Sequence, residues 1–329
     1  MEIKKIIRII TLEQLLECFR PVRGFYDEFV INLSITFAPL IHFFFIKKRN
    51  KYLICRPRGG LNDTLNRIEL CCRYALKYRR RLYIDTSKSR LWDSLFNYFI
   101  LPNYIIPEKV DFIKYPASVY PDCLKNDIYN YESEPTHQGM KIKDGPYLQF
   151  DFNRNYLEDY LIYENFGGGE LAVFFLKRII LNKCVRLHIA SVINKLGFYA
   201  AVHIRNTDLK TEYKPFLHGL TNEIKHDVVV ISTDSYEVQQ YGKQLFGDRL
   251  ILPISIPDLG GKALHNQNNL DTSERYNTCV DILTDLFILA CSDKLYMTKV
   301  TGGFYSGFGI LAMKLKNNKR LIKRLLLGV

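Results

Sequence analysis

The stretch YAAVHIRNTDLKTEYKPF, residues 199–216, changes abruptly from apolar to charged. Its first part, residues 199–204, is a short apolar run rich in aromatic and β-branched residues, which is typical of a buried strand. His203, Arg205 and Asp208 stand at the carboxyl end of that strand, where open α/β sheets bind their ligands. The planar fork of an arginine suits a phosphate. The stretch therefore predicts either an anion site at the end of a parallel strand or a structural Arg–Asp pair that closes the strand.

Length and composition indicate a globular chain of two domains. The 329 residues are 47% hydrophobic and 24% charged, which leaves enough apolar material for two cores. The net charge of +12 favours phosphates or an anionic membrane surface as partners. No zinc-finger spacing or RNA-binding signature accompanies it, so nucleic acid is not the expected partner. The eight cysteines form no CxxC, and we see no secretory signal, so we expect a cytoplasmic protein without disulfides or zinc.

Residues 1–50 form a basic and apolar segment that we treat separately from the two domains. Residues 3–19 carry apolar side chains at helical spacing beside lysines, the pattern of a helix that lies on an anionic bilayer. Residues 29–46 are mostly apolar but are interrupted by polar side chains and a proline. A buried helix or a surface-seated element is expected there rather than a membrane span, which stays as the alternative. We expect the protein to be peripheral on the inner face of the cytoplasmic membrane.

From residue 51 onward the sequence alternates between strand and helix patterns. A strand at 52–55, a turn at 56–63, a basic-ended helical pattern and a strand at 82–85 predict a βαβ unit. Further elements are expected as helical patterns at 155–165, 169–195 and 280–292, loops at 101–150, and strands at 199–204, 227–232, 249–254 and 294–298. We therefore expect an α/β protein with two doubly wound, Rossmann-like domains, 51–195 and 196–329, which face a cleft.

The turn RPRGGLND, residues 56–63, predicts a second candidate site. Gly59 and Gly60 let the backbone approach a ligand, and the start of the following helix, near Asn62, offers N–H groups to an anion or a sugar. Neither GK[ST] nor GxGxxG spacing is present, so this is not a nucleoside-triphosphate or dinucleotide loop. An ordinary strand-to-helix turn would need no ligand, and that reading stays open.

Four segments together resemble a known family, the nodulation and core α1,6-fucosyltransferases. Residues 56–85 resemble the opening βαβ unit of the family, and HIRNTDLKTE, residues 203–212, resembles its His-x-Arg-Arg-x-Asp motif. ISTDS, residues 231–235, is similar to the family's strand that ends in Thr-Asp, and residues 264–293 resemble its Leu-His-Asn loop and following helix. The segments occur in the family's order. Position 206 departs from the family, because asparagine stands where the family has the second arginine.

The resemblance implies a GT-B fold, GDP-fucose as the donor, inversion at the anomeric carbon, and no metal or other cofactor. The sequence agrees on one point, since it contains no Asp-x-Asp, the usual holder of a metal on a nucleotide-sugar diphosphate. By position, the resemblance implies that the donor is contacted by His203, Arg205, Lys210, Glu212, Asp234, Asp285 and Thr301. It implies catalytic roles for Arg205 and Asp208, and an acceptor or donor loop that includes Gly59, Gly60, Asn62, His265 and Asn266.

Other roles are open for several of these side chains. Asp285 can be a buried acid with a structural partner, Asp234 can cap a helix, and Asp208 can orient Arg205 without touching substrate. No general base is identified. We expect a fucosyltransferase that acts on a cell-surface glycan or a lipid-linked glycan precursor. The alternatives are the same fold with another nucleotide sugar, and a non-catalytic carbohydrate-binding scaffold.

Overall fold

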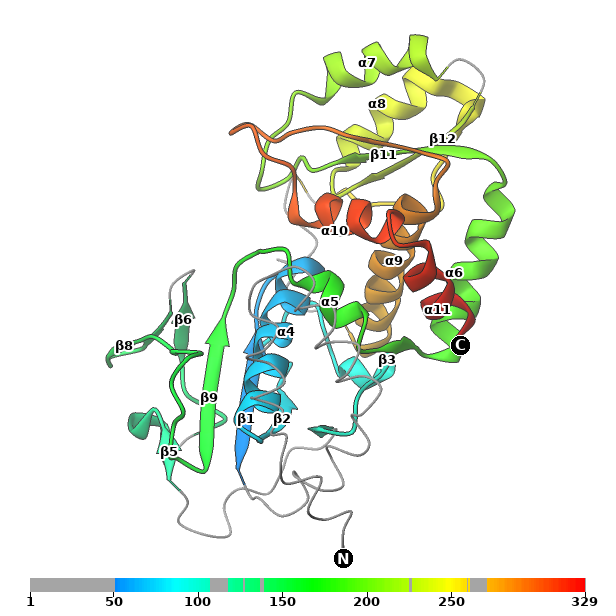
Figure 1. Cartoon of the computed structure of the whole chain (residues 1–329). Coiled ribbons are helices and arrows are strands. Elements are labelled where there is room, and N and C mark those ends of the chain that lie inside the picture. The colour runs from blue at the N-terminus through cyan, green and yellow to red at the C-terminus, as the bar shows by residue number, and fades with distance from the viewer. Residues whose placement is uncertain are drawn as a thin grey trace, which may run out of the picture.

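A computed structural model describes residues 51–106, 118–126, 128–136, 139–224, 227–258, 260 and 271–328 (Figure 1). The predictions for residues 1–50, and those for His265 and Asn266, lie outside the described residues. None of the helices in the described part of the chain is long and apolar enough to cross a membrane.

The first sheet is parallel and has the order β4-β2-β1-β9-β5. Helix α4 (Leu61–Lys77) joins β1 to β2, which confirms the predicted βαβ unit. Strand β1 is buried along its whole length, because helices cover one face of the sheet and loops with a small antiparallel sheet cover the other (Figure 1). The strands are β1 (Tyr52–Pro57), β2 (Arg81–Ile84), β4 (Ile105–Ile106), β5 (Val119–Tyr120) and β9 (Tyr160–Asn165).

The prediction of a helix at 155–165 was wrong, because this stretch contains β9, which pairs with β1 along six residues. The run Tyr-Leu-Ile-Tyr is short, and periodicity alone cannot separate a buried strand from a buried helix at that length. The triglycine 167–169 therefore separates a strand from a helix. The expected helix at 169–195 is interrupted, giving α5 (Ala172–Leu176), β10 (Ile180–Leu181) and α6 (Lys183–Leu196).

Residues expected to be loops at 101–150 contain short strands. The antiparallel sheet β6-β7-β8 lies here, and a second antiparallel pair, β10-β3, lies outside this range. Their strands and the short 3-10 turns are η2 (Leu95–Asn97), β3 (Phe99–Ile100), η4 (Asp122–Leu124), β6 (Ser133–Pro135), β7 (Met140–Ile142) and β8 (Tyr147–Leu148).

The second sheet is parallel, has the order β13-β12-β11-β14, and uses the four strands predicted from the sequence. The strands are β11 (Tyr199–Ile204), β12 (Val228–Thr233), β13 (Leu250–Ile251) and β14 (Lys294–Met297). The accompanying helices are α7 (Tyr213–Glu223), α8 (Tyr236–Phe246), η5 (Gly247–Arg249), α9 (Thr272–Cys291), α10 (Gly307–Lys316) and α11 (Lys319–Leu327). Helix α9 begins earlier than expected, because Asp271 and Glu274 form a capping box at its start.

Alternate residues of β11 face two different cores. Ala200 and Val202 pack with α7 and α8. Tyr199 and Ala201 join a hydrophobic cluster that continues through α9, α10 and α11 to α4 and the first sheet. The side chain of His203 follows on this second face, because side chains alternate along a strand. The strand therefore directs His203 into the region between the two sheets.

A buried ion pair holds α5 against α4. The guanidinium of Arg178 donates to the Glu69 carboxylate from Nε (2.7 Å) and from Nη2 (3.0 Å), and Arg73 adds a bond of 2.9 Å. Glu69 and Arg178 are both buried. Their carboxylate and guanidinium are paired through two parallel bonds, the strongest geometry for such a pair.

Replacing Arg178 with methionine should strongly destabilise the protein, since buried Glu69 would lose both bonds to Arg178 and, among the described residues, keep only half-buried Arg73. Removing one member of a buried pair costs about 3 kcal/mol or more. Urea denaturation followed by circular dichroism measures the loss in free energy of unfolding. The exposed Arg90→Met is the control and should stay within about 0.5 kcal/mol of the parent chain. Equal stability of the two variants would show that the pair does not stabilise the fold.

Candidate functional site

His203 contacts the N-terminus of α10. Its Nε2 lies 2.6 Å from the hydroxyl of Ser306, the N-cap residue, and that hydroxyl also accepts a bond of 3.1 Å from the backbone N–H of Gly309. A Cβ at Gly309 would lie only 2.8 Å from the imidazole, so glycine permits this approach. Burial lowers the pKa of His203 to about 4, so the imidazole is neutral at neutral pH. His203 thus positions the helix N-terminus as a neutral hydrogen-bonding group.

Arg205 lies between two carboxylates just beyond β11. Nη2 is 2.6 Å from Oδ1 of Asp208, and Nη1 is 2.8 Å from Oδ2 of Asp234. The Arg205 side chain is 23% exposed, so its fork is reachable from solvent. The structure therefore shows the Arg–Asp pair that the sequence left open, together with a partly exposed cation.

Asp234 organises the loop that carries Arg205. Its carboxylate accepts from the backbone N–H of Asn206 at 2.8 Å and from the hydroxyl of Thr207. The helix that follows has Ser235 as its N-cap residue. Asp234 therefore braces the 205–211 loop, and the helix-cap role considered for it is wrong.

Asn206, which departs from the family motif, is buried inside this loop. Its Oδ1 accepts from the backbone N–H of Thr211 at 3.3 Å, and its Nδ2 lies 3.5 Å from the hydroxyl of Ser235. An amide can both donate and accept here, whereas an arginine can only donate. The residue at this position therefore supports the loop in this chain.

Lys210 and Thr301, both assigned to the donor by the family resemblance, lie together in the structure. The backbone N–H and the hydroxyl of Thr301 both donate to the carbonyl of Lys210, at 2.7 and 2.9 Å. Glu212 is exposed and precedes α7 as its N-cap residue. The loop after β11 and the loop after β14 are thus joined at the carboxyl end of the second sheet.

Asp285 lies under the same end of the sheet, on α9. Its Oδ2 accepts a hydrogen bond of 3.0 Å from Ser232, the residue of β12 that is in register with His203. Burial raises the pKa of Asp285 to about 7, and burial also raises the pKa of Asp281 one turn earlier. Asp285 is therefore a carboxyl that can change its protonation state near neutral pH.

The glycine turn after β1 lies opposite the start of α10. Gly59 has φ +97°, a conformation that favours glycine, and Gly60 is the N-cap residue of α4. The Asn62 amide donates to the carbonyl of Gly169 at 3.3 Å, and a Cβ at Gly307 would lie 2.5 Å from this amide nitrogen. Of the predicted residues in this turn, Asn62 thus meets the N-terminus of α10, which His203 contacts from the second sheet.

Sequence reasoning missed the α10 residues that link these halves. Ser306 begins the segment SGFG, a serine N-cap followed by two glycines, and this signal was available in the sequence. It also missed a charged cluster at the carboxyl ends of β1, β2 and β9. In this cluster Arg56 pairs with Asp85 at 2.6 Å and Arg58 pairs with Glu164 at 2.8 Å.

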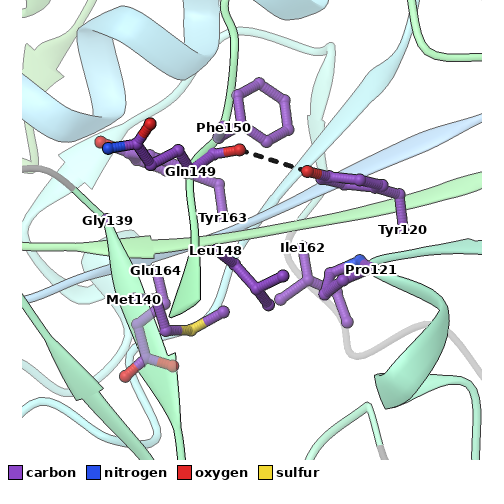
Figure 2. Close-up of a pocket in the computed structure, with 10 residues that line it drawn as sticks. All are labelled: Tyr120, Pro121, Gly139, Met140, Leu148, Gln149, Phe150, Ile162, Tyr163 and Glu164. Atoms are coloured by element: carbon purple, nitrogen blue, oxygen red, sulfur yellow. Dashed lines mark hydrogen bonds between the residues drawn. The ribbon is translucent and has the colours of Figure 1, made fainter. Parts of the chain in front are cut away.

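Figure 2 shows a pocket that Glu164 of this charged cluster helps to line, between β9 and the segment of β7 and β8. The hydroxyl of Tyr120 donates to the carbonyl of Gln149 at its rim, at 3.2 Å. None of the sequence-predicted site residues lines it. The lining residues are Tyr120, Pro121, Gly139, Met140, Leu148, Gln149, Phe150, Ile162, Tyr163 and Glu164.

The described residues contain no group of three or more His, Cys, Asp or Glu side chains placed to hold a metal ion.

Comparison with known proteins identifies the fold. No family model and no curated protein matches the sequence. Among solved structures, NodZ α-1,6-fucosyltransferase co-crystallised with GDP superposes with a TM-score of 0.54 at 17% identity, over 80% of this chain and 92% of that chain. The fucosyltransferase NodZ from Bradyrhizobium gives 0.53 at 16% identity over the same shares. The chain has the NodZ fold. The likeness extends over 80% of this chain, and it agrees with the family resemblance of the sequence segments.

Proposed function

We propose that the chain is an inverting glycosyltransferase that transfers fucose from GDP-fucose to a cell-surface or lipid-linked glycan without a metal. The proposal includes a GT-B arrangement, with domains 51–195 and 196–329 facing a cleft. Solved structures with this fold include NodZ with GDP and NodZ soaked with GDP-fucose. The observation that carries the proposal is that His203, the Arg205 loop and the N-terminus of α10 meet at the carboxyl end of β11.

Charge on the departing GDP would be stabilised by the protein's own groups. The N–H groups at the start of α10 and the fork of Arg205 are the donors proposed for the diphosphate. Gly307 and Gly309, at this helix start, let Asn62 and His203 approach the helix closely and so hold it in place. His203 stays neutral and holds the helix start through Ser306, while Lys210 and Thr301 would lie beside the phosphates.

Donor binding would require Arg205 to change partners. Its fork is held by Asp208 and Asp234, and a phosphate that binds both prongs of the fork would replace at least one of these carboxylates. Asp208 is the better candidate to release it, because its side chain is 46% exposed whereas that of Asp234 is 9% exposed. We assign Asp208 the role of holding Arg205 in place until the donor arrives.

We assign each of the remaining predicted residues to the binding of either the donor or the acceptor. Asp285 would accept from the N1–H and amino group of guanine in its ionised form. Glu212 is proposed near the donor, and Gly59, Gly60 and Asn62 near the acceptor, together with the loop that contains His265 and Asn266. The protein would act in the cytoplasm, peripherally on the inner face of the cytoplasmic membrane.

One observation favours a second candidate, the same fold with another nucleotide sugar. Asn206 replaces the family's second arginine and is committed to bonds within the loop, so one positive charge is missing next to the diphosphate. A non-catalytic carbohydrate-binding scaffold is the third candidate, and turnover of a nucleotide sugar separates it from both enzymes.

GDP should raise the Tm of the protein by several degrees at saturation, because a ligand that binds only the folded state stabilises it. A thermal-shift series with GDP, UDP, CMP and dTDP measures this, and GDP should give the largest shift. Transfer activity should survive EDTA. Loss of activity in EDTA with recovery in Mn²⁺ would contradict the metal-independent mechanism, and a larger shift with UDP would favour the second candidate.

Arg205→Lys should lower kcat more than it weakens donor binding, since lysine keeps the charge but loses the two-pronged geometry. Arg205→Ala should lower kcat by on the order of 10²–10³. Steady-state kinetics and Tm are measured for both variants. If Arg205 served only to hold the loop, the lysine variant would remain nearly fully active and the alanine variant would mainly lose stability.

GDP affinity should rise with pH between about 6 and 8, because guanine needs ionised Asp285 and the pKa of that carboxyl is about 7 in the free protein. Below this pKa the affinity should fall roughly tenfold per pH unit. The folding stability of the free protein depends on pH in the opposite direction. The raised pKa of Asp285 favours folding at low pH, and this contribution is lost as the pH rises toward 7. Calorimetric titration across this range measures the affinity.

Two variants make this pH test specific. Asp285→Asn should flatten the pH dependence and weaken GDP binding. Ser232→Ala should move the midpoint to higher pH, because the Ser232 hydrogen bond lowers the pKa of Asp285. A pH profile unchanged by both substitutions would remove Asp285 from the nucleotide site.

A further inference from the structure

Helices α6 and α11 pack against each other at one side of the molecule (Figure 1). The carbonyl oxygens of Leu176 and Ile179 accept from the guanidinium of Arg324, at 2.9 and 3.3 Å, and so tie α11 to the segment before α6. A Cβ on Gly328 would collide with the guanidinium of Arg186, so the end of α11 lies directly on α6. The two helices therefore form one continuous surface.

The two helices of this surface carry cations and no acid. The sequence holds no Asp or Glu from 171 to 207 or from 294 to 329, so neither helix has a carboxylate side chain. Lys183 on α6 and Lys319, Arg320 and Lys323 on α11 are exposed. Cations without interspersed acids repel one another, so this surface favours an anionic partner.

Exposed leucines stand among these cations. Leu187 is 57% exposed on α6, next to the Arg186 that the end of α11 contacts, and Leu327 is 55% exposed at the end of α11. One exposed leucine on a surface is ordinary. Two of them on adjoining helices with exposed cations and no acids form the pattern of an element that lies in a bilayer interface.

We propose that this surface, which we call the α6–α11 face, docks the protein on an anionic lipid bilayer. Lys183, Lys319, Arg320 and Lys323 contact lipid phosphates, and Leu187 and Leu327 enter the boundary between headgroups and acyl chains. Nucleic acid would match the cations alone, because its backbone offers nothing for exposed leucines to bury against. The proposal assigns membrane contact to folded helices, in addition to residues 3–19, and does not depend on the glycosyltransferase activity.

The α6–α11 face is connected to the candidate site through α10. This helix has its N-cap residue, Ser306, in the site and is followed by α11 after only two residues. Ten residues of helix span about 15 Å. Docking by α11 would therefore hold the candidate site within reach of a glycan attached to a lipid in the same membrane.

The test is co-sedimentation of the full chain with vesicles of phosphatidylcholine that contain roughly one third phosphatidylglycerol. The variant K319Q/R320Q/K323Q should bind about 100-fold more weakly, because each basic residue near an anionic surface strengthens binding about fivefold. The matched control K125Q/K141Q/K243Q removes the same charge from exposed lysines elsewhere and should keep most of the binding. Tm and the thermal shift with GDP should be unchanged in both variants, which shows that folding and the nucleotide response are intact.

Further variants separate the alternatives. Leu187→Ser with Leu327→Ser should abolish the part of the binding that resists salt. K4Q/K5Q/R8Q reports the contribution of residues 3–19 in the same assay. The proposal is overturned if K319Q/R320Q/K323Q binds vesicles like the parent chain, or if the matched control loses as much as it does. It is also overturned if the parent chain binds duplex RNA but not the vesicles, which would make the face a nucleic-acid surface.

Discussion

The contact between His203 and Ser306 is the interaction on which the candidate site depends. It joins the carboxyl end of β11 to the start of α10, and Gly309 allows the helix to come close enough for it to form. From the other side, Asn62 at the start of α4 meets Gly307. One helix N-terminus is thus held by residues of both sheets, so its unpaired N–H groups have a defined direction.

His203 holds the N-terminus of α10 as a neutral imidazole, and a charged imidazole would do this less well. Burial lowers the pKa of His203 to about 4, and the nearby Arg205 guanidinium acts in the same direction. The site therefore has the positive charge of Arg205 beside the hydrogen-bond donors of α10. For the proposed diphosphate, this division would let the cation change partners while the helix start stays in place. In the structure Arg205 is paired with two carboxylates.

The sequence predicted the parts of this arrangement that are local. Strand β11 and its charged end were found at their observed residues, because an apolar run followed by charge is a short-range signal. Strand β9 was missed, since its identity comes from pairing with β1 more than a hundred residues earlier. The bracing role of Asp234 was missed for the same reason, because its partners Asn206 and Thr207 belong to a different strand end. The predictions for residues 1–50 and for the Leu-His-Asn loop concern parts of the chain outside the described residues.

Interior ion pairs explain how the basic composition becomes a basic surface. Glu69, Asp85 and Glu164 are buried, and each is paired with an arginine. A buried carboxylate needs such a partner, because an uncompensated charge in the interior is costly. The negative charge of these three acids is therefore cancelled by arginines within the first half of the molecule. The sequence has no acid from 171 to 207 or from 294 to 329, so α6 and α11 carry part of the net charge of +12 without carboxylates of their own. Part of the surplus of positive charge is therefore located on α6 and α11. Helix α10 connects α11 to the candidate site.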